Sequence, residues 1–209
     1  SSDLSNGNSF DEATKNQLYT DIYDDSMWLI NLVENLLSIT RMEGQGVHLH
    51  METELLEEVI DEAMRHINRR HEHHTIRVNQ VGDYILADMD ARLIIQVITN
   101  LVDNAVKYTP EGSTIMVNSR QEGASAVIDV SDNGPGIPDE SKEKIFEMFY
   151  TTGHKSADGK RGMGLGLPLC RAILSAHKGT IEVLDNKPAG SIFRLTLPAK
   201  EEIGRASCR

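Results

Sequence analysis

The 209-residue sequence predicts an α+β sandwich that follows one long N-terminal helix. From residue 47 onward, helical periodicity and period-two alternation take turns along the chain. Such interspersed helices and antiparallel-type strands fit an α+β sandwich better than a doubly wound parallel sheet. The hydrophobic content of 39% and the charged content of 25% are those of an ordinary globular protein, and the length suits one good-sized domain, or one domain and a smaller appendage.

Composition excludes several classes of protein. The formal net charge of −11 argues against a nucleic-acid binder, which normally presents a basic face. No apolar run approaches the roughly 18 residues of a membrane span, and we expect no signal peptide. Cys170 and Cys208 provide no disulfide framework, so we expect a reduced, cytosolic protein.

A long helix is predicted over Phe10–Glu43, where apolar residues recur on seven-residue grids and "EGQG" ends the pattern. The grids contain Leu18, Leu32 and Ile39, and Ile22, Leu29 and Leu36, with Asp25 interrupting the first. One helix cannot bury such a seam, so we expect a partner helix from a longer protein or from a second copy. An ordinary core helix lying on the next domain remains the alternative.

The two ends of the chain differ in composition from the rest. Residues 1–9 are expected to form a flexible N-terminus. Residues 201–209, which include "IGRASCR", are expected to be a non-native tail. Neither end is assigned a function.

After the long helix, the sequence predicts shorter elements without any internal repeat. Gly123 is predicted to lie between two strands, and an irregular stretch follows the second of them. Strands are expected near 47–51, 75–79, 84–88, 114–121, 124–132, 179–185 and 191–197, and helices near 53–68, 90–108 and 165–177.

The helix near 90–108 carries a polar stripe in the decamer "NLVDNAVKYT". Helical spacing places Asn100, Asn104 and Tyr108 on one face, with Lys107 beside them. Amide oxygens are hard, neutral ligands that suit Mg²⁺, so Asn104 is a candidate direct ligand and Asn100 a candidate ligand through water. Lys107 is then placed to meet phosphate, and Tyr108 to flank sugar or base. The alternative is a polar stripe that simply faces solvent.

A second candidate lies in "AVIDVSDNGPGIP", where alternation places Asp132 on the same strand face as Ile128 and Val130. A carboxylate in such a position is costly unless hydrogen-bond donors meet it, and the exocyclic amine of a purine is such a donor. Gly136 lets a flat ligand lie close to the backbone. The alternative is a plain Asp-Asn-Gly turn.

A third candidate is the glycine-rich "GKRGMGLGLPLCRAI", in which Gly162, Gly164 and Gly166 precede an apolar helix. A loop of this kind aims backbone N–H groups and the positive end of a helix at a phosphate. It matches neither GxxxxGK[ST] nor GxGxxG. The basic stretch before it is interpreted as a mobile lid over polyphosphate, and residues 150–163 are expected to be disordered without nucleotide.

Four stretches in this order resemble the N, G1, F and G2 boxes of the ATP-binding domain of bacterial sensor histidine kinases: "NLVDNAVKYT", "DNGPGIP", "IFEMFY" and "GMGLGL". The resemblance covers about residues 47–198 and implies a Bergerat-type (GHKL) two-layer α/β sandwich with a mixed sheet. ATP then lies between helices and sheet, with ATP and Mg²⁺ as the implied cofactors. We expect the ATP-binding domain to span residues 46–200.

The resemblance also implies the roles of individual residues. Asn104 is implied as the Mg²⁺ ligand and Asp132 as the partner of the adenine amine, while Phe146 and Phe149 pack beneath the lid. The implied catalytic residues are Asn100, Asn104 and Lys107. The implied nucleotide contacts are Asn104, Lys107, Tyr108, Asp132, Gly134, Gly136, Ile137, Phe149, Lys160, Arg161, Gly162, Met163, Gly164, Leu165, Gly166 and Leu167.

The helix over residues 10–45 is similar to the second helix of the dimerisation and phosphotransfer hairpin of these kinases. This implies a homodimer through that hairpin, a response regulator receiver domain as partner, and no nucleic-acid partner. It also implies a cytoplasmic domain whose intact protein is anchored in the inner or plasma membrane only through upstream regions. The wider pattern, including "GLPLCRAI", resembles the potassium-responsive sensor kinases.

The sequence departs from the family because none of its eight histidines lies in a phosphoacceptor context such as His-Glu-Leu-Arg-Thr-Pro. We therefore expect transfer of the γ-phosphoryl group of Mg-ATP to a histidine outside this sequence, and no autophosphorylation by this chain. The stretch "RRHEHHT" does not match HExxH and is expected to be a solvated turn rather than a metal site.

Three rival functions share the implied fold. The first is that of related ATPases, which activate water with a glutamate one turn before the metal-binding asparagine. This chain has Asn100 there, whose amide cannot accept a proton. Asp103 is expected to face solvent, so phosphotransfer is favoured over hydrolysis. The second rival is an ATP-sensing module without catalysis, and the third is a serine-directed protein kinase of the superfamily.

Overall fold

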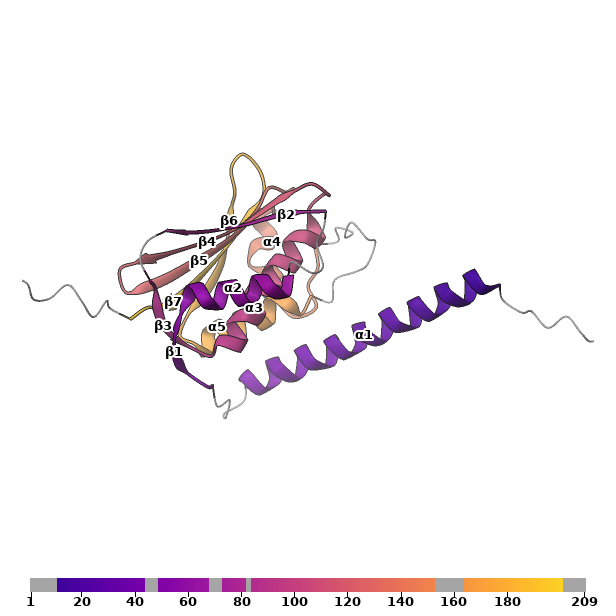
Figure 1. The fold of residues 1–209 in the computed structure, drawn as a ribbon, viewed down its shortest axis with the longest axis horizontal. Helices are drawn as coiled ribbons and strands as arrows, with labels where there is room; N and C mark the ends of the chain where they lie inside the picture. The colour runs from indigo at the N-terminus through magenta and orange to yellow at the C-terminus, as the bar shows by residue number, and fades with distance from the viewer. Residues whose placement is uncertain (1–10, 44–48, 68–72, 82–83, 153–163, 201–209) are drawn as a thin grey trace, which may run out of the picture.

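The computed structural model of this protein shows one long helix and a body in which helices pack on a sheet (Figure 1). The expectations for residues 1–9, for the tail over 201–209 and for the lid over 153–163 lie outside the described residues. The structure describes residues 11–43, 49–67, 73–81, 84–152 and 164–200.

A mixed sheet forms one layer of the body. Its strands are β2 (Thr75–Val81), β4 (Thr114–Glu122), β5 (Ser125–Asp132), β6 (Thr180–Asp185) and β7 (Ser191–Pro198). They pair in the order β2-β4-β5-β7-β6, with β2 parallel to β4 and the other neighbours antiparallel. The predicted α+β class and the mixed sheet are therefore confirmed.

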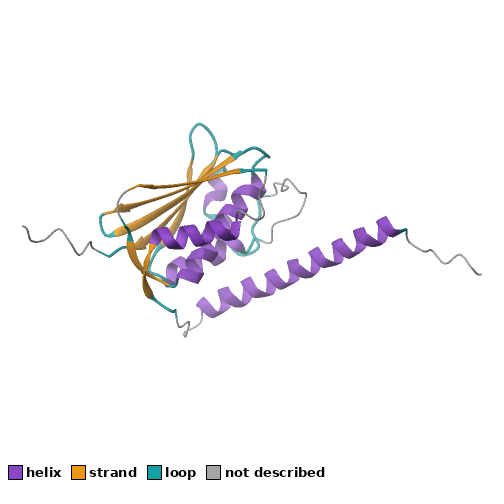
Figure 2. Cartoon of the chain, in the orientation of Figure 1, coloured by secondary structure: helices purple, strands orange, loops and turns teal. Residues whose placement is uncertain are grey.

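Helices form the second layer, on one face of this sheet (Figures 1 and 2). They are α2 (Leu56–Ile67), α3 (Ala91–Tyr108) and α5 (Gly166–Ala176). The inward side chains of β5, such as Ile128 and Val130, are at most 1% exposed and join the apolar faces of these helices in one core. Asp132 continues this inward face, so the last residue of a central strand points to the helical layer.

A second, two-stranded antiparallel sheet joins β1 (Glu52–Leu55) to β3 (Leu86–Met89). The strand expected near 47–51 is thus wrong in position, because the strand occupies residues that the sequence assigned to the start of a helix. The cause is a long-range pairing, in which Thr53 Oγ1 donates to Asp88 Oδ1 at 2.6 Å across the two strands. Such a pairing overrides local propensity. The stretch expected to be irregular also contains α4 (Asp139–Lys142) and the 3₁₀ helix η1 (Lys144–Phe146).

The long helix α1 (Glu12–Glu43) extends away from the body and contacts it only near its C-terminal end (Figure 1). There Ile39 is 2% exposed and Leu32 packs against the core, beside α5. Other side chains of the seam remain exposed: Leu18 (48%), Ile22 (54%), Leu29 (53%) and Leu36 (39%). One end of the seam therefore lies on the domain, as in the alternative interpretation, and the rest has no partner among the described residues. None of the described helices is long and apolar enough to cross a lipid bilayer.

An ion cluster fixes the outer face of β5. Asp129 is 8% exposed and accepts hydrogen bonds from Arg194 on β7 and from Arg120 on β4. Burial by itself would raise the pKa of Asp129, but the hydrogen bonds from Arg194 and Arg120 outweigh it and hold the pKa below its ordinary value of 3.8. The cluster ties three adjacent strands together just before β5 ends at Asp132.

We predict that Asp129→Asn lowers the free energy of unfolding by about 2 kcal/mol near neutral pH, because both arginines lose a charged acceptor. Since the folded pKa of Asp129 is depressed, this stabilisation is complete above the ordinary pKa and is lost as pH falls through the folded value. Urea unfolding of both proteins should show a constant difference down to about pH 4 that narrows below it.

The control is Asp139→Asn, which removes an exposed carboxylate paired with Lys142 and should change stability little at any pH. A stability difference for Asp129→Asn that stays the same at acidic pH would contradict the assigned role of the carboxylate.

Candidate functional site

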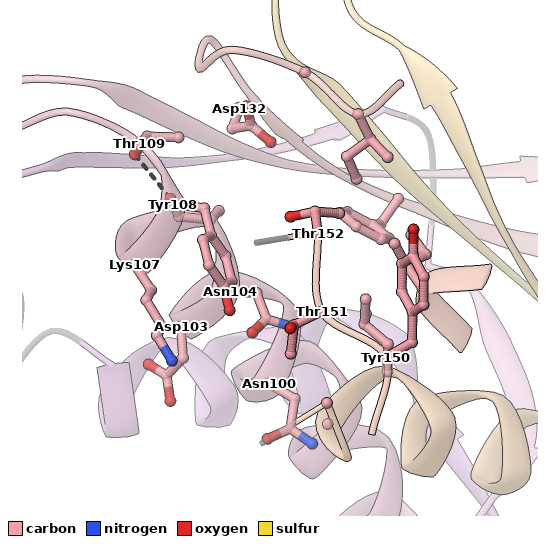
Figure 3. Close-up of a pocket in the computed structure, with 18 of the residues that line it drawn as sticks. Asn100, Asp103, Asn104, Lys107, Tyr108, Thr109, Asp132, Tyr150, Thr151 and Thr152 are labelled. Carbon is pink, nitrogen blue, oxygen red and sulfur yellow. Dashed lines mark hydrogen bonds between the residues drawn. The ribbon is translucent and has the colours of Figure 1, made fainter. Parts of the chain in front are cut away.

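A cavity of about 540 Å³ opens between α3, the end of β5 and the start of α5. Small-molecule sites usually measure roughly 300–1,000 Å³, so this volume suits a ligand of nucleotide size. Figure 3 shows the α3 side chains on one side of the cavity and Tyr150, Thr151 and Thr152 on the other, with Asp132 above them.

The polar stripe of α3 faces this cavity, while the opposite side of the helix packs into the core. Asn100, Asn104, Lys107 and Tyr108 all line the cavity, so the stripe borders a hollow of the surface (Figure 3). Asp103 was expected to face solvent, but it lines the cavity beside Lys107. Positions 100, 103, 104 and 107 are spaced by three and four residues and therefore form one face of a helix.

The Asp132 carboxylate turns toward the same cavity (Figure 3). Asp132 is 7% exposed, and its Oδ1 accepts hydrogen bonds from the backbone N–H groups of Gly134 at 2.8 Å and Ser191 at 3.3 Å. Burial raises the pKa of Asp132, and these two donors offset only part of that effect. The Gly134 bond is that of an Asp-Asn-Gly turn, so the turn and the buried carboxylate are both present. Within the described chain no donor meets Oδ2, which leaves this oxygen for a ligand.

Close packing after Asp132 brings the strand end and the helix end together. A Cβ atom on Gly134 would lie 2.6 Å from Thr109 Cγ2, just beyond the end of α3. Thr109 is fixed in turn because its Oγ1 donates to Ala105 O at 2.8 Å. Only glycine at position 134 permits this approach, which places the Asp132 carboxylate and the α3 stripe around one cavity.

A hydrogen bond between main-chain groups holds together the described segments on either side of residues 153–163. Phe149 N–H donates to Gly164 O at 2.9 Å. Gly164 adopts a φ of +66°, and a Cβ atom there would lie 2.6 Å from Tyr150 O, so both the conformation and the space require glycine. Gly164 and Gly166 line the cavity, and a Cβ atom on Gly166 would lie 3.9 Å from Asn104 Nδ2. The first turn of α5 therefore borders the amide stripe of α3.

The structure brings most of the described candidate residues to the cavity. Those that line it are Asn100, Asn104, Lys107, Tyr108, Asp132, Gly136, Ile137, Gly164, Gly166 and Leu167. Leu165 does not, because its side chain turns into the core and is fully buried. Gly134 does not line the cavity, although its N–H group binds Asp132, and Phe149 is 62% exposed outside it. Lys160, Arg161, Gly162 and Met163 lie outside the described residues.

The two phenylalanines of "IFEMFY" differ in their surroundings. Phe146 is 5% exposed and packs under the Arg171 guanidinium, 4.3 Å from the ring centroid. Phe149 is exposed and has a positive φ of 65°. The lid itself is not described, so packing of either ring beneath it stays a prediction.

Sequence reasoning missed several residues that line the cavity. Phe193 reaches it from β7, and only the alternation along that strand could have indicated an inward side chain. Glu34 and Asn35 reach it from α1. No motif marks these positions, because nothing in the local sequence places α1 next to α3.

A family model described as "Histidine kinase-, DNA gyrase B-, and HSP90-like ATPase" matches residues 89–201. This match spans more than half of the chain and includes α3, Asp132 and the start of α5. The chain belongs to this family. Within the family it is an ATP-binding catalytic domain of the sensor histidine kinase type, so the resemblance indicated by the four motifs is confirmed.

Individual relatives agree with this membership. The chain is 40% identical over 195 residues to the sensor protein KdpD of Clostridium acetobutylicum. The matched region covers 93% of this chain and 22% of KdpD. It is similar to the structure of the Acinetobacter baumannii histidine kinase AdeS, with a TM-score of 0.73, 25% identity, and 92% and 87% of the two chains covered. It is also similar to the histidine kinase ThkA in complex with the response regulator protein TrrA, with a TM-score of 0.74, 26% identity, and 90% and 52% covered. The chain thus spans about a fifth of the length of KdpD.

We predict that Gly164→Ala destabilises the protein more than Gly112→Ala. Both glycines have a positive φ, +66° and +82°, so alanine is strained at either position by about 1 kcal/mol. Only position 164 adds a steric clash, because nothing lies within 4 Å of a Cβ atom at position 112.

Urea unfolding should therefore show a loss for Gly164→Ala that is at least about twice the loss for Gly112→Ala. Equal losses would contradict the tight main-chain contact between Gly164 and the Phe149–Tyr150 segment.

Proposed function

We propose that this chain binds ATP with Mg²⁺ in the cavity and transfers the γ-phosphoryl group to a histidine outside these residues. The phosphoryl group then passes to an aspartate of a response regulator receiver domain. The observation that carries the proposal is the presence in one cavity of a buried carboxylate, Asp132, and of the amide stripe of Asn100 and Asn104. The carboxylate fits a purine amine, and the amides fit a hydrated cation and phosphate.

Base recognition follows from the free oxygen of Asp132. The exocyclic amine of adenine donates two hydrogens, and Oδ2 is an acceptor that its protein neighbours leave open. Apolar side chains border the same cavity and can enclose the flat ring: Ala105, Ile137, Ile145 and Phe193. Enclosure strengthens the hydrogen bond between the amine and the carboxylate, because it removes competing water.

The donor set of α3 fits magnesium. Asn104 would hold the ion through its amide oxygen and Asn100 through water, since Mg²⁺ takes few protein ligands and keeps several waters. When bound, the ion neutralises negative charge on the transferred group. Lys107 and the N–H groups at the start of α5 offset further phosphate charge from the two sides of the cavity.

Transfer to an imidazole requires mainly positioning and charge neutralisation, because an imidazole nitrogen is already a nucleophile. Hydrolysis requires a base for water, and one turn before Asn104 the chain has Asn100, whose amide cannot accept a proton. One observation nevertheless favours ATP hydrolysis as a second candidate. Asp103 is a carboxylate that lines the cavity, beside Lys107 (Figure 3).

The acceptor histidine is proposed to lie outside these residues for two reasons. None of the eight histidines has a phosphoacceptor context, and none of the described ones lines the cavity. The buried His177 uses both ring nitrogens, since Nδ1 donates to Ile173 O at 2.7 Å and Nε2 accepts from Asp90 N–H at 3.0 Å. It is therefore a structural residue that joins α5 to the start of α3.

The remaining parts of the proposal concern partners. The exposed apolar seam of α1 supports its assignment over residues 10–45 as the second helix of a dimerisation hairpin in a longer, membrane-anchored protein. The complex of ThkA with TrrA supports a receiver domain as the partner of this chain. The likeness to KdpD supports the sensor-kinase subtype expected from "GLPLCRAI".

We predict that Asp132→Asn keeps the fold and changes the purine preference. Asparagine still accepts the Gly134 N–H through Oδ1, but its Nδ2 presents a donor where Oδ2 was an acceptor. ATP should bind about tenfold more weakly, because two donors then face each other. ITP, whose 6-oxo group is an acceptor, should bind more tightly to the variant than to the parent protein.

Isothermal titration of both nucleotides into both proteins measures the four affinities. The same ratio of ATP affinity to ITP affinity in the parent protein and the variant would contradict the assignment of Asp132 to the base.

We predict that this chain phosphorylates a separately supplied helical hairpin that carries the phosphoacceptor histidine of its parent protein. With γ-labelled ATP, acid-labile label should appear on the hairpin and not on this chain, because the chain lacks an acceptor context. Asn104→Ala should abolish transfer, whereas Asp103→Asn should retain most of it. Phosphate release that depends on Asp103, without label on the hairpin, would favour hydrolysis instead.

A further inference from the structure

One fully buried side chain contacts the α3 stripe from behind. Cys170 on α5 is 0% exposed, and Asn100 Nδ2 donates toward its Sγ at 3.9 Å. The same Sγ lies 4.0 Å from the carbonyl oxygen of Val97, to which its S–H donates. The thiol thus contacts two groups of α3 that are about one helical turn apart, the side chain of Asn100 and the main-chain carbonyl of Val97.

This contact decides which end of the Asn100 amide faces the cavity. An amide side chain has a donor end and an acceptor end, and the two are nearly equal in size. Because Nδ2 is turned to sulfur, Oδ1 is the end that remains for the cavity. Figure 3 shows the Asn100 amide at the cavity edge, with its nitrogen and oxygen turned to opposite sides.

The thiol can hold both of its bonds at once. Burial raises the pKa of the Cys170 thiol to about 12, and the hydrogen bond from Asn100 acts in the opposite direction with smaller effect. The thiol S–H donates to Val97 O, and the sulfur accepts from Asn100 Nδ2. A purely apolar side chain at position 170 would fill the same space but leave the amide nitrogen without this partner.

We propose that Cys170 is a positioning residue that holds the Asn100 amide with its oxygen toward the cavity, so that Asn100 can support the Mg²⁺-bound triphosphate through water. The inference rests on the proposed function, because it assumes that Asn100 acts on the hydrated ion. Cys170 itself does not line the cavity. Its role is therefore separate from that of any residue that touches the nucleotide.

The expected effect is small but measurable. Residues that orient a metal ligand commonly change metal affinity by about 10–100-fold, and Cys170 acts one step further away through a weak sulfur bond. We therefore expect Cys170→Ala to reduce the gain in ATP affinity caused by Mg²⁺ by about threefold. ATP affinity measured in a chelator should stay unchanged, because Cys170 does not touch base or phosphate.

The experiment is a double-mutant cycle on this chain, with ATP titrated calorimetrically in Mg²⁺ and in a chelator. Cys170→Ala should lower the Mg²⁺-dependent gain in ATP affinity. In the Asn100→Ala background, Cys170→Ala should not lower the Mg²⁺-dependent gain in ATP affinity any further. Ile173→Val is the matched control, since it removes one methyl group from a fully buried side chain of the same helix.

A second measurement does not depend on nucleotide. The side-chain amide signals of Asn100 in a nitrogen–proton correlation spectrum should shift or broaden in Cys170→Ala and stay in place in Ile173→Val. Unmoved signals in Cys170→Ala, or a loss of the Mg²⁺-dependent gain that persists in the Asn100→Ala background, would overturn the positioning role.

Failure of the proposed function gives a different result. If Asn104→Ala keeps the full Mg²⁺-dependent gain, the metal site on α3 is wrong, and the inference about Cys170 falls with it. If Asn104→Ala loses the gain while Cys170→Ala and Ile173→Val behave alike, the function stands and Cys170 is only a core residue.

Discussion

The carboxylate of Asp132 is held at the end of β5 by two backbone N–H groups, from Gly134 and Ser191, which both bind Oδ1. These bonds orient the side chain but do not compensate fully for its burial, so its pKa remains raised. Oδ2 receives no hydrogen bond from the described residues, so it can accept one from the amine of the proposed ligand. Much of the surrounding structure serves this arrangement. The arginine pairs of Asp129 fix the strand, and the missing side chain of Gly134 lets α3 approach.

Helix α3 has two faces with different tasks. One side packs into the core, and the other carries amides and a lysine into the cavity. Because a helix in a packed core is rigid, the amides keep a fixed position relative to Asp132 and to the first turn of α5, where Gly166 approaches Asn104. The Phe149–Gly164 hydrogen bond holds the described segments on either side of residues 153–163 together. The proposed binding positions for the base and for the phosphates therefore lie on one scaffold of packed elements.

Much of the fold and part of the candidate site could be predicted from sequence. The α3 stripe and Asp132 were found because each breaks a strong hydrophobic pattern, and a polar residue on an apolar face needs a physical reason. The strand β1 was misplaced because its pairing partner Asp88 lies 35 residues away in sequence, and Thr53 gives no local sign of that pairing. Asp103 was assigned to solvent because its position was judged against Asn104 alone, whereas the whole helical face turns to the cavity. Contributions from β7 and α1 depend on tertiary packing and leave no motif.

The central claim is that one cavity holds the adenine at Asp132 and the magnesium-bound phosphates between α3 and the start of α5. A crystal structure of this chain with Mg²⁺ and a non-hydrolysable ATP analogue tests it most directly. The account predicts the adenine amine within hydrogen-bond distance of Asp132 Oδ2, and the metal ion bound by Asn104 Oδ1 and phosphate oxygens. A base bound away from Asp132, or a metal ion that contacts no residue of α3, would contradict it.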